Sequence, residues 1–172
     1  SGCLRESDYY CIRVEEVRVG RVTPSGTPVV QGHFRALYLD KLLHGVASLD
    51  DPTVLYYGYE QLYASAVKRL RPPGSRLDAF LIGGGSYTFP RYLEALYRGE
   101  ILVAEIDPAV TAVARSHLGL SPQSRIEIRH EDARRALRSL PDGKTFDVVL
   151  GDAFNDYAVP YHLTTREFNE LV

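Results

Sequence analysis

The chain has 172 residues, of which 45% are hydrophobic and 24% are charged, and its formal net charge is −2. This composition is ordinary for a globular protein with one good-sized core, and the near-neutral charge does not indicate broad electrostatic binding to nucleic acid. No apolar run approaches the roughly 20 residues that cross a bilayer, and no signal peptide is visible. We therefore expect a cytoplasmic chain that binds no nucleic acid and does not itself insert into a membrane.

Two residue types set further expectations. The only cysteines, Cys3 and Cys11, have no second pair at metal-ligand spacing, so we expect neither a disulfide framework nor a zinc site. The sequence contains no Met. This absence indicates that the chain does not begin at a translation start and is a piece of a longer protein.

The N-terminal part has the pattern of a small antiparallel sheet followed by a helix. Short runs rich in Tyr, Ile, Val and Leu predict strands at residues 8–19, 34–39 and 42–47. Asp51 and Pro52 fit the cap and first turn of a helix that runs from residue 54 to about residue 70.

The Pro-Pro-Gly stretch at residues 72–74 ends that helix and suggests a domain boundary. We expect residues 1–73 to form an N-terminal β-domain with its linking helix, and residues 74–172 to form a second domain.

In the second part, strand and helix patterns alternate. Strands are expected at four apolar runs, residues 79–82, 101–106, 125–129 and 146–150. Helices are expected near residues 90–97, around Val110, Val113 and Ala114, around Ala133, Ala136, Leu137 and Leu140, and from residue 164 onward. Repeated β-α units with short connections predict a doubly wound, mostly parallel, Rossmann-like sheet. Since the chain stops as a further unit begins, we expect this domain to be incomplete, and an exposed sheet edge favours a homo-oligomer.

Candidate site residues follow the ends of the expected strands. They are Gly83, Gly84, Gly85 and Ser86, then Glu105, then Asp132, and then Asp152 and Asp156. In a doubly wound sheet the carboxyl ends of the strands converge on one crevice, which turns these scattered residues into one predicted site. Each also has a structural interpretation: the glycines can form a tight turn, and Asp132 can cap the helix that follows it.

The pattern favours an adenosyl ligand. Glycines let the backbone approach a ligand, and Glu105 follows Gly85 by 20 residues, near the spacing at which an acid meets ribose hydroxyls. An acid after the third strand can accept a hydrogen bond from an adenine amino group. The glycine run is neither G-x-G-x-x-G nor a Walker motif, so an adenosyl group without pyrophosphate fits better than a dinucleotide or a triphosphate.

The order of four motifs resembles the spermidine synthase family of polyamine aminopropyltransferases. The motifs are GGG, VAEIDP, HEDARRAL and FDVVLGDAF, and the similarity extends over most of the chain. The phrases GGGSYTFPRYLEALY and VPYHLTTREF look most like divergent bacterial members. Some of those members are fused to membrane segments, and the resemblance allows the same for the parent of this chain.

The resemblance implies a class I methyltransferase-like Rossmann fold, decarboxylated S-adenosylmethionine as donor, a di- or polyamine as acceptor, and no metal or redox cofactor. Carried over by position, Glu105 holds the ribose and Asp132 the adenine. Asp152 starts the loop that covers the reaction centre, and the acceptor-binding acid follows close behind it.

The sequence departs from the family pattern after the glycines. Ser86 stands where the family usually has an Asp that contacts the ammonium group of the donor, a charge partner worth about 1.5–3 kcal/mol. The acceptor-binding acid is also ambiguous: by count from Asp152 it becomes Asn155, and with one insertion before Pro160 it becomes Asp156, which we favour.

The acceptor side offers three further candidates. His44 stands where the family has a glutamine, although a histidine on a surface strand is an equal interpretation. The family places a tyrosine near its amine groove, and either Tyr56 or Tyr57 fits that position, while packing between domains accounts for most of the other tyrosines.

Three functions remain open. The first is a spermidine synthase-like transferase domain, and the second is an S-adenosylmethionine-dependent methyltransferase of small molecules, for which Ser86 is tolerable because that donor also carries a carboxylate. The third is a non-catalytic nucleoside-binding domain.

Overall fold

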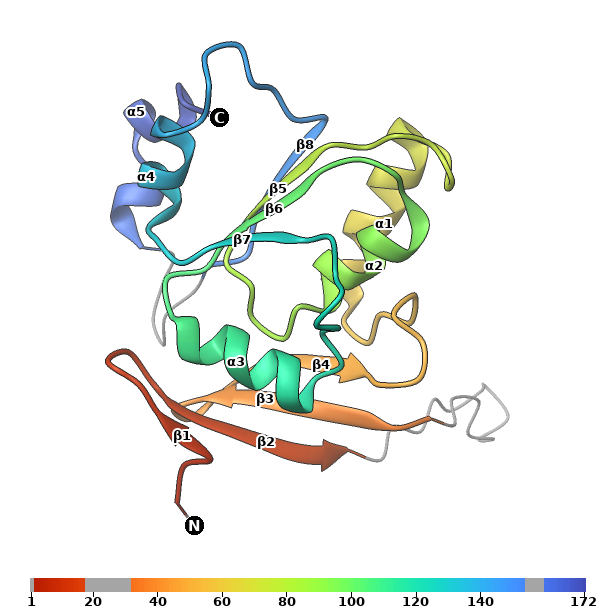
Figure 1. The fold of residues 1–172 in the computed structure, drawn as a ribbon, viewed down its shortest axis with the longest axis vertical. Coiled ribbons are helices and arrows are strands. Elements are labelled where there is room, and N and C mark those ends of the chain that lie inside the picture. The colour runs from red at the N-terminus through yellow and green to blue at the C-terminus, as the bar shows by residue number, and fades with distance from the viewer. Residues whose placement is uncertain (1, 18–31, 154–159) are drawn as a thin grey trace.

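The computed structural model describes residues 2–17, 32–153 and 160–172, and these form two sheets of four strands with helices packed around them (Figure 1). One sheet is antiparallel and lies at the N-terminal end of the molecule. The other is parallel and occupies the middle of Figure 1, with helices on both of its faces. The expected Rossmann-like fold preceded by a small β-domain is therefore confirmed.

The antiparallel sheet is a meander. Its strands, β1 (Arg5–Glu6), β2 (Cys11–Val17), β3 (Phe34–Leu39) and β4 (Leu42–Ser48), pair in chain order. Asp40, in the tight turn between β3 and β4, has a φ of 54°, and its carboxylate Oδ1 accepts a hydrogen bond from the Cys11 backbone N–H at 2.9 Å. The turn is thereby tied to the neighbouring strand β2.

A disulfide joins Cys3 and Cys11, with 5.4 Å between their Cα atoms. The sequence argument made a disulfide unlikely, and that expectation was wrong for this pair. The reason is the two-residue strand β1, which folds back on β2 so that Glu6 pairs with Cys11 and brings Cys3 near it. The hairpin is too short to be recognised from the sequence.

The linking helix starts later than expected. Helix α1 spans Gly58–Leu70 rather than residues 54–70. Asp51 does not cap it, because its carboxylate accepts hydrogen bonds from the backbone N–H and the hydroxyl of Thr53 and so closes a turn. Leu55 then pairs with Ala47 at the edge of the first sheet, which keeps this segment extended.

The parallel sheet has the strand order β7-β6-β5-β8. Its strands are β5 (Ala79–Ile82), β6 (Ile101–Ala104), β7 (Glu127–Arg129) and β8 (Val148–Gly151). The connecting helices are α2 (Thr88–Leu96), α3 (Pro108–His117) and α4 (Ala133–Arg138), and the 3-10 turn η1 (Tyr161–Leu163) and the helix α5 (Arg166–Asn169) follow β8. These elements appear where the sequence predicted them, within a few residues at the ends.

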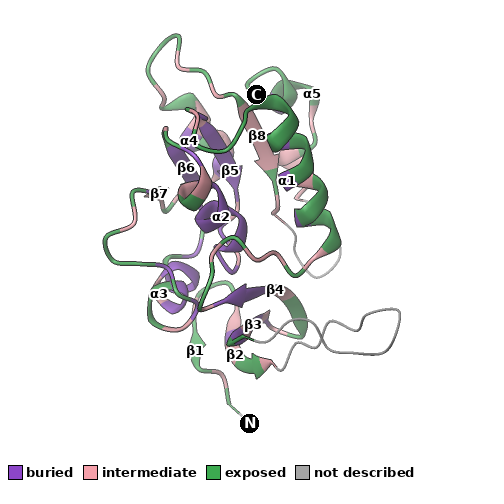
Figure 2. Cartoon of the chain, turned by 90° about the vertical axis from the view of Figure 1, so that its right-hand side faces the viewer, coloured by how far each residue is buried: buried purple, intermediate pink, exposed green. Residues whose placement is uncertain are grey.

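Both faces of the central strands are buried (Figure 2). Ala79 and Leu81 of β5 belong to a core cluster with residues of α1, α2 and α3, whereas Phe80 and Ile82 pack toward α4 and α5. Successive side chains of a strand point to opposite faces, so a continuous apolar run indicates a strand covered on both sides.

The first cluster also contains residues of the antiparallel sheet, among them Ile12 and Leu37. The two sheets therefore share one hydrophobic core. The domain division at residues 73 and 74 stays a prediction.

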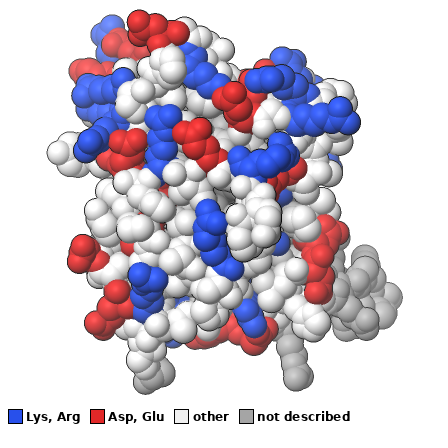
Figure 3. Space-filling model, viewed as in Figure 1, with Lys and Arg blue, Asp and Glu red and all other residues white. Residues whose placement is uncertain are grey.

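The face shown in Figure 3 carries interspersed basic and acidic side chains rather than a patch of one sign. Among the residues that the structure describes, no helix is long and apolar enough to cross a membrane.

Candidate functional site

The glycine loop after β5 needs glycine at two positions for different reasons. Gly83 has a φ of +93°, and a side chain there would bring its Cβ within 2.9 Å of the Asp152 carbonyl oxygen. At Gly84 a Cβ would meet the Tyr87 ring at 2.5 Å. The loop is thus compressed between the end of β8 and helix α2, which brings bare backbone to the carboxyl edge of the sheet.

Glu105 follows β6 and fixes this loop. Its two carboxylate oxygens accept hydrogen bonds from the backbone N–H groups of Gly84 at 2.7 Å and Asp107 at 2.9 Å. The residue is only 6% exposed, and burial raises the pKa of its carboxyl group, opposed by these backbone hydrogen bonds. Each oxygen has a second lone pair, so the carboxylate can hold the loop and still accept a hydrogen bond from a ligand hydroxyl.

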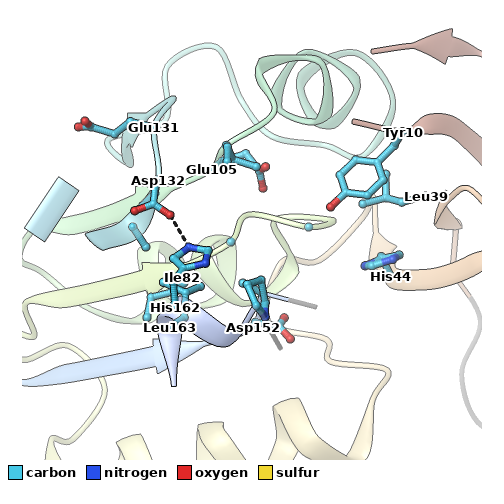
Figure 4. A pocket seen from close by; sticks show the side chains of 17 residues that line it. Tyr10, Leu39, His44, Ile82, Glu105, Glu131, Asp132, Asp152, His162 and Leu163 are labelled. Carbon is cyan, nitrogen blue, oxygen red and sulfur yellow. Dashed lines mark hydrogen bonds and ion pairs between the residues drawn. The ribbon is translucent and has the colours of Figure 1, made fainter. Parts of the chain in front are cut away.

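Asp132 caps a helix, as one interpretation of the sequence expected, and also lines the pocket. Its Oδ1 accepts from the backbone N–H groups of Arg134 and Arg135, which makes it the N-cap of α4. Its Oδ2 lies 2.8 Å from the Nε2 of His162, which comes from the η1 turn (Figure 4). Asp132 therefore presents one oxygen to the helix and the other to the pocket.

Asp152 follows β8, across the glycine loop from Glu105. Its Oδ2 accepts a hydrogen bond of 3.2 Å from the hydroxyl of Tyr59 on α1. Burial raises the pKa of Asp152 to about 6, and the Tyr59 hydrogen bond opposes that shift. The tyrosine approaches from 93 positions away in the sequence.

These groups line one pocket at the carboxyl ends of the parallel strands (Figure 4). The antiparallel sheet closes its other side with Tyr10 and His44, whose ring centroids are 6.3 Å apart. Ser7, in the disulfide-bonded hairpin, donates a hydrogen bond of 2.5 Å to Asp107 Oδ2 and so anchors the hairpin beside the pocket. The structure thus brings Gly83, Gly85, Glu105, Asp132, Asp152 and His44 to the same cavity.

Comparison with known proteins gives the same relatives by sequence and by fold. A curated polyamine aminopropyltransferase from Vibrio vulnificus is 32% identical over 116 residues, which cover 66% of this chain and 38% of that protein. No family model matches the chain. The chain is thus similar in sequence to a polyamine aminopropyltransferase.

Among solved structures, a probable spermidine synthase from Corynebacterium glutamicum matches with a TM-score of 0.77 and 22% identity, over 99% of this chain and 58% of that one. A spermidine synthase in complex with the transition-state analogue AdoDATO matches with a TM-score of 0.60 and 22% identity, over 97% of this chain and 51% of that one. Human methyltransferase-like protein 13, in complex with SAH, matches with a TM-score of 0.57 and 18% identity, over 67% of this chain and 59% of that one. These likenesses establish the fold, and the chain spans 38% of the length of its curated relative.

Ser86 turns away from the main pocket. It is 4% exposed, and its hydroxyl lies 2.6 Å from that of Thr88 at the start of α2. On its other side it packs against β4, where a Cβ added at Gly45 would come within 2.1 Å of its Oγ. The serine therefore takes part in internal packing and supplies no negative charge.

A second cavity lies beside the first, between the β3–β4 hairpin and α1. Tyr57, Tyr59 and Tyr63 line it together with His44 and Asp152. Of the two tyrosines that the sequence proposed, Tyr57 reaches this cavity. Tyr56 is 45% exposed and packs edge-on against the Tyr57 ring.

Sequence reasoning missed Tyr59 and Glu60, both on α1. Glu60 is 3% exposed, and its buried Oε2 has no hydrogen-bond partner among the described residues. Tyr10 and His162 were missed as well. The sequence of α1 gave no local signal that Glu60, the one acid of this helix, faces a pocket.

The expected acceptor-binding acid, Asp156, and its alternative Asn155 lie outside the described residues. Within the described ranges, the structure contains no cluster of three or more His, Cys, Asp or Glu side chains that could hold a metal ion.

Proposed function

We propose that this chain binds decarboxylated S-adenosylmethionine in the main pocket and transfers its aminopropyl group to a di- or polyamine. One observation supports this most strongly: the glycine loop, Glu105, Asp132 and Asp152 all line a single cavity at the carboxyl ends of the parallel strands. The curated relative is named as an aminopropyltransferase. An adenosylmethionine-type ligand in general also suits the fold, since a similar structure is described with SAH.

The residues fit an adenosyl group without rearrangement of their own hydrogen bonds. Glu105 can accept from ribose hydroxyls with its remaining lone pairs, while the Gly84 and Asp107 amides hold it in place. Asp132 Oδ2 can accept from the adenine amino group with the lone pair that the His162 contact leaves free. Tyr10 and His44 bound the pocket on the side of the antiparallel sheet.

The chemistry is a single displacement. The neutral nitrogen of the acceptor attacks the carbon next to the sulfonium, the carbon–sulfur bond breaks, and its electron pair stays on sulfur as methylthioadenosine leaves. The new ammonium group then loses a proton. We assign its acceptance to Asp152, directly or through the hydroxyl of Tyr59, with which Asp152 forms a hydrogen bond. The remaining catalysis is positioning. We assign the acceptor ammonium to Asp156, with His44 and Tyr57, of the two candidate tyrosines Tyr56 and Tyr57, lining its path.

Calorimetry tests the proposal. Tight binding of decarboxylated S-adenosylmethionine and of methylthioadenosine supports it. Preference for intact S-adenosylmethionine would instead favour a small-molecule methyltransferase, and binding of none of the three would leave a non-catalytic domain.

Asp156→Asn should lower transfer strongly while the affinity for methylthioadenosine stays nearly unchanged. Equal loss of both would contradict its assignment to the acceptor.

We also infer self-association and a cytoplasmic location. Light scattering tests the first. Thiol trapping of Cys3 and Cys11 in cells tests the second, because a persistent disulfide is typical of an oxidising compartment.

A further inference from the structure

The small cavity behind the glycine loop is lined by two carboxylates. Glu60 and Asp152 line it from α1 and from the end of β8, together with Gly83, Gly84 and Ser86. Within the part of the chain that the structure describes, neither acid forms a salt bridge. Residues 154–159, which follow in the sequence, contain no Lys or Arg. Among the residues that the structure describes, this cavity thus combines two acidic groups with no basic partner.

Among the described residues, only one of the two carboxylate oxygens of Glu60 has a hydrogen-bond partner. Glu60 is the third residue of α1, and its carboxylate has a hydrogen bond with the backbone of Tyr57, the N-cap. This is the reach of a capping-box residue, for which Glu and Gln serve equally well. The other oxygen, Oε2, is buried and unpartnered. A buried polar group left without a partner costs about 1–3 kcal/mol and more when charged, so it calls for an explanation.

The electrostatics of Glu60 point the same way. Burial raises its pKa to about 7, and the nearby negative charge of Asp152 adds to this, while the Tyr57 backbone opposes it. The other titratable groups that face it, Tyr57 and Tyr59, also have raised pKa values, mainly through burial and in part through Glu60 itself. The group that would relieve all of these interactions is a cation.

We propose that Glu60, with Asp152 beside it, binds the terminal ammonium group of the donor's aminopropyl chain. The cavity shares Gly83 and Asp152 with the main pocket, so a short chain extending from a sulfonium above the glycine loop enters it directly. Ser86 lies on its wall without a charge, and Glu60 supplies from α1 the negative charge that the loop lacks. The inference rests on the proposed function, because it requires the nucleoside in the main pocket.

The test compares two nucleosides that differ in the aminopropyl group. Decarboxylated S-adenosylmethionine and methylthioadenosine are titrated into the wild-type chain, Glu60→Gln and, as a matched control, Glu127→Gln. The last removes a 58% exposed carboxylate at the start of β7, remote from the cavity. Since Gln preserves the capping-box interaction, Glu60→Gln removes the charge and keeps the helix start.

We expect Glu60→Gln to weaken the binding of decarboxylated S-adenosylmethionine about 10- to 100-fold. Its affinity for methylthioadenosine should change less than about twofold, and Glu127→Gln should bind both nucleosides with nearly wild-type affinity. An equal loss of affinity for both nucleosides would show that Glu60 has a structural role. Unchanged affinity for both would show that Glu60 does not contribute to donor binding. An increase only in the KM for the acceptor would show that Glu60 binds the acceptor instead. Each of these results overturns the inference.

A second readout does not depend on affinity. Near pH 6.5, binding of the ammonium-bearing nucleoside should release a proton from the wild-type cavity, measured by calorimetry in buffers of different ionisation enthalpy. Glu60→Gln should release fewer protons, and an unchanged release would contradict the assignment. If wild type binds neither nucleoside, the proposed function itself fails. If wild type binds methylthioadenosine and binds decarboxylated S-adenosylmethionine no more tightly, only the proposed role of Glu60 fails.

Discussion

The two sides of the pocket use carboxylates in opposite ways. On the side of β6 and β7, Glu105 and Asp132 accept two and three hydrogen bonds, mostly from backbone amides. On the side of α1 and β8, Glu60 has an unpartnered oxygen, and Asp152 is contacted by one tyrosine hydroxyl. The first pair is therefore already fixed by hydrogen bonds in the free protein. The second pair has few hydrogen bonds among the described residues, and on the inference above a bound cation would relieve the electrostatic cost of burying it.

The largest expected effect is on the reaction itself. Asp152→Asn should lower the rate of aminopropyl transfer about 100-fold or more, the usual range for a lost proton acceptor, and leave methylthioadenosine affinity within about twofold. Because the pKa of Asp152 is raised to about 6, the wild-type rate should increase as pH rises through that value. Steady-state kinetics between pH 5 and 8 check this. A rate that is flat across this range would remove Asp152 from proton transfer.

On the side of β6 and β7, Glu105→Ala should weaken the binding of methylthioadenosine about 100-fold, or about 3 kcal/mol in binding free energy. The substitution removes the ribose acceptor and frees the Gly84 and Asp107 amides that it holds. Calorimetry measures the effect, with Glu127→Ala as the exposed control. Unchanged affinity would mean that the nucleoside does not lie against β6.

The comparison also predicts a stability effect. Because the pKa of Glu60 in the folded chain is about 7 and its unperturbed value is 4.5, its contribution to stability is fully present below pH 4.5 and is lost as pH rises through 7. Glu60→Gln lacks this loss, so it should be more stable than wild type at pH 8, by about 1–3 kcal/mol, and nearly equal at pH 5.

Urea unfolding at both pH values measures that difference. Glu127→Gln should follow the wild-type profile, and a Glu60→Gln chain that is less stable at pH 8 would show that the carboxylate is already well compensated.

The smallest expected effect concerns Asp132. Because it caps α4 through Oδ1, Asp132→Ala should lower the free energy of unfolding by about 1 kcal/mol without any ligand, whereas Asp132→Asn keeps a capping oxygen and should lose little. Thermal unfolding of the two variants makes the comparison. Equal losses would indicate that the contact with His162, rather than the cap, carries the stability.

The sequence by itself determined the parallel sheet and the nucleoside side of the pocket. Continuous apolar runs such as residues 79–82 and 101–104 are local signals of strands covered on both faces, and parallel strands bring their carboxyl ends to one edge. The pattern of strands was therefore enough to predict that Gly83, Glu105 and Asp132 lie at one edge of the sheet.

The tertiary structure alone decided the other side. Tyr59 meets Asp152 across 93 positions, Glu60 enters a cavity behind the glycines, and Leu55 pairs with Ala47 so that α1 begins at Gly58 rather than after Asp51. The Cys3–Cys11 disulfide likewise depends on a hairpin of two-residue strands. Contacts of this kind follow from how separate elements pack. No local periodicity encodes which face of α1 is held against the end of β8.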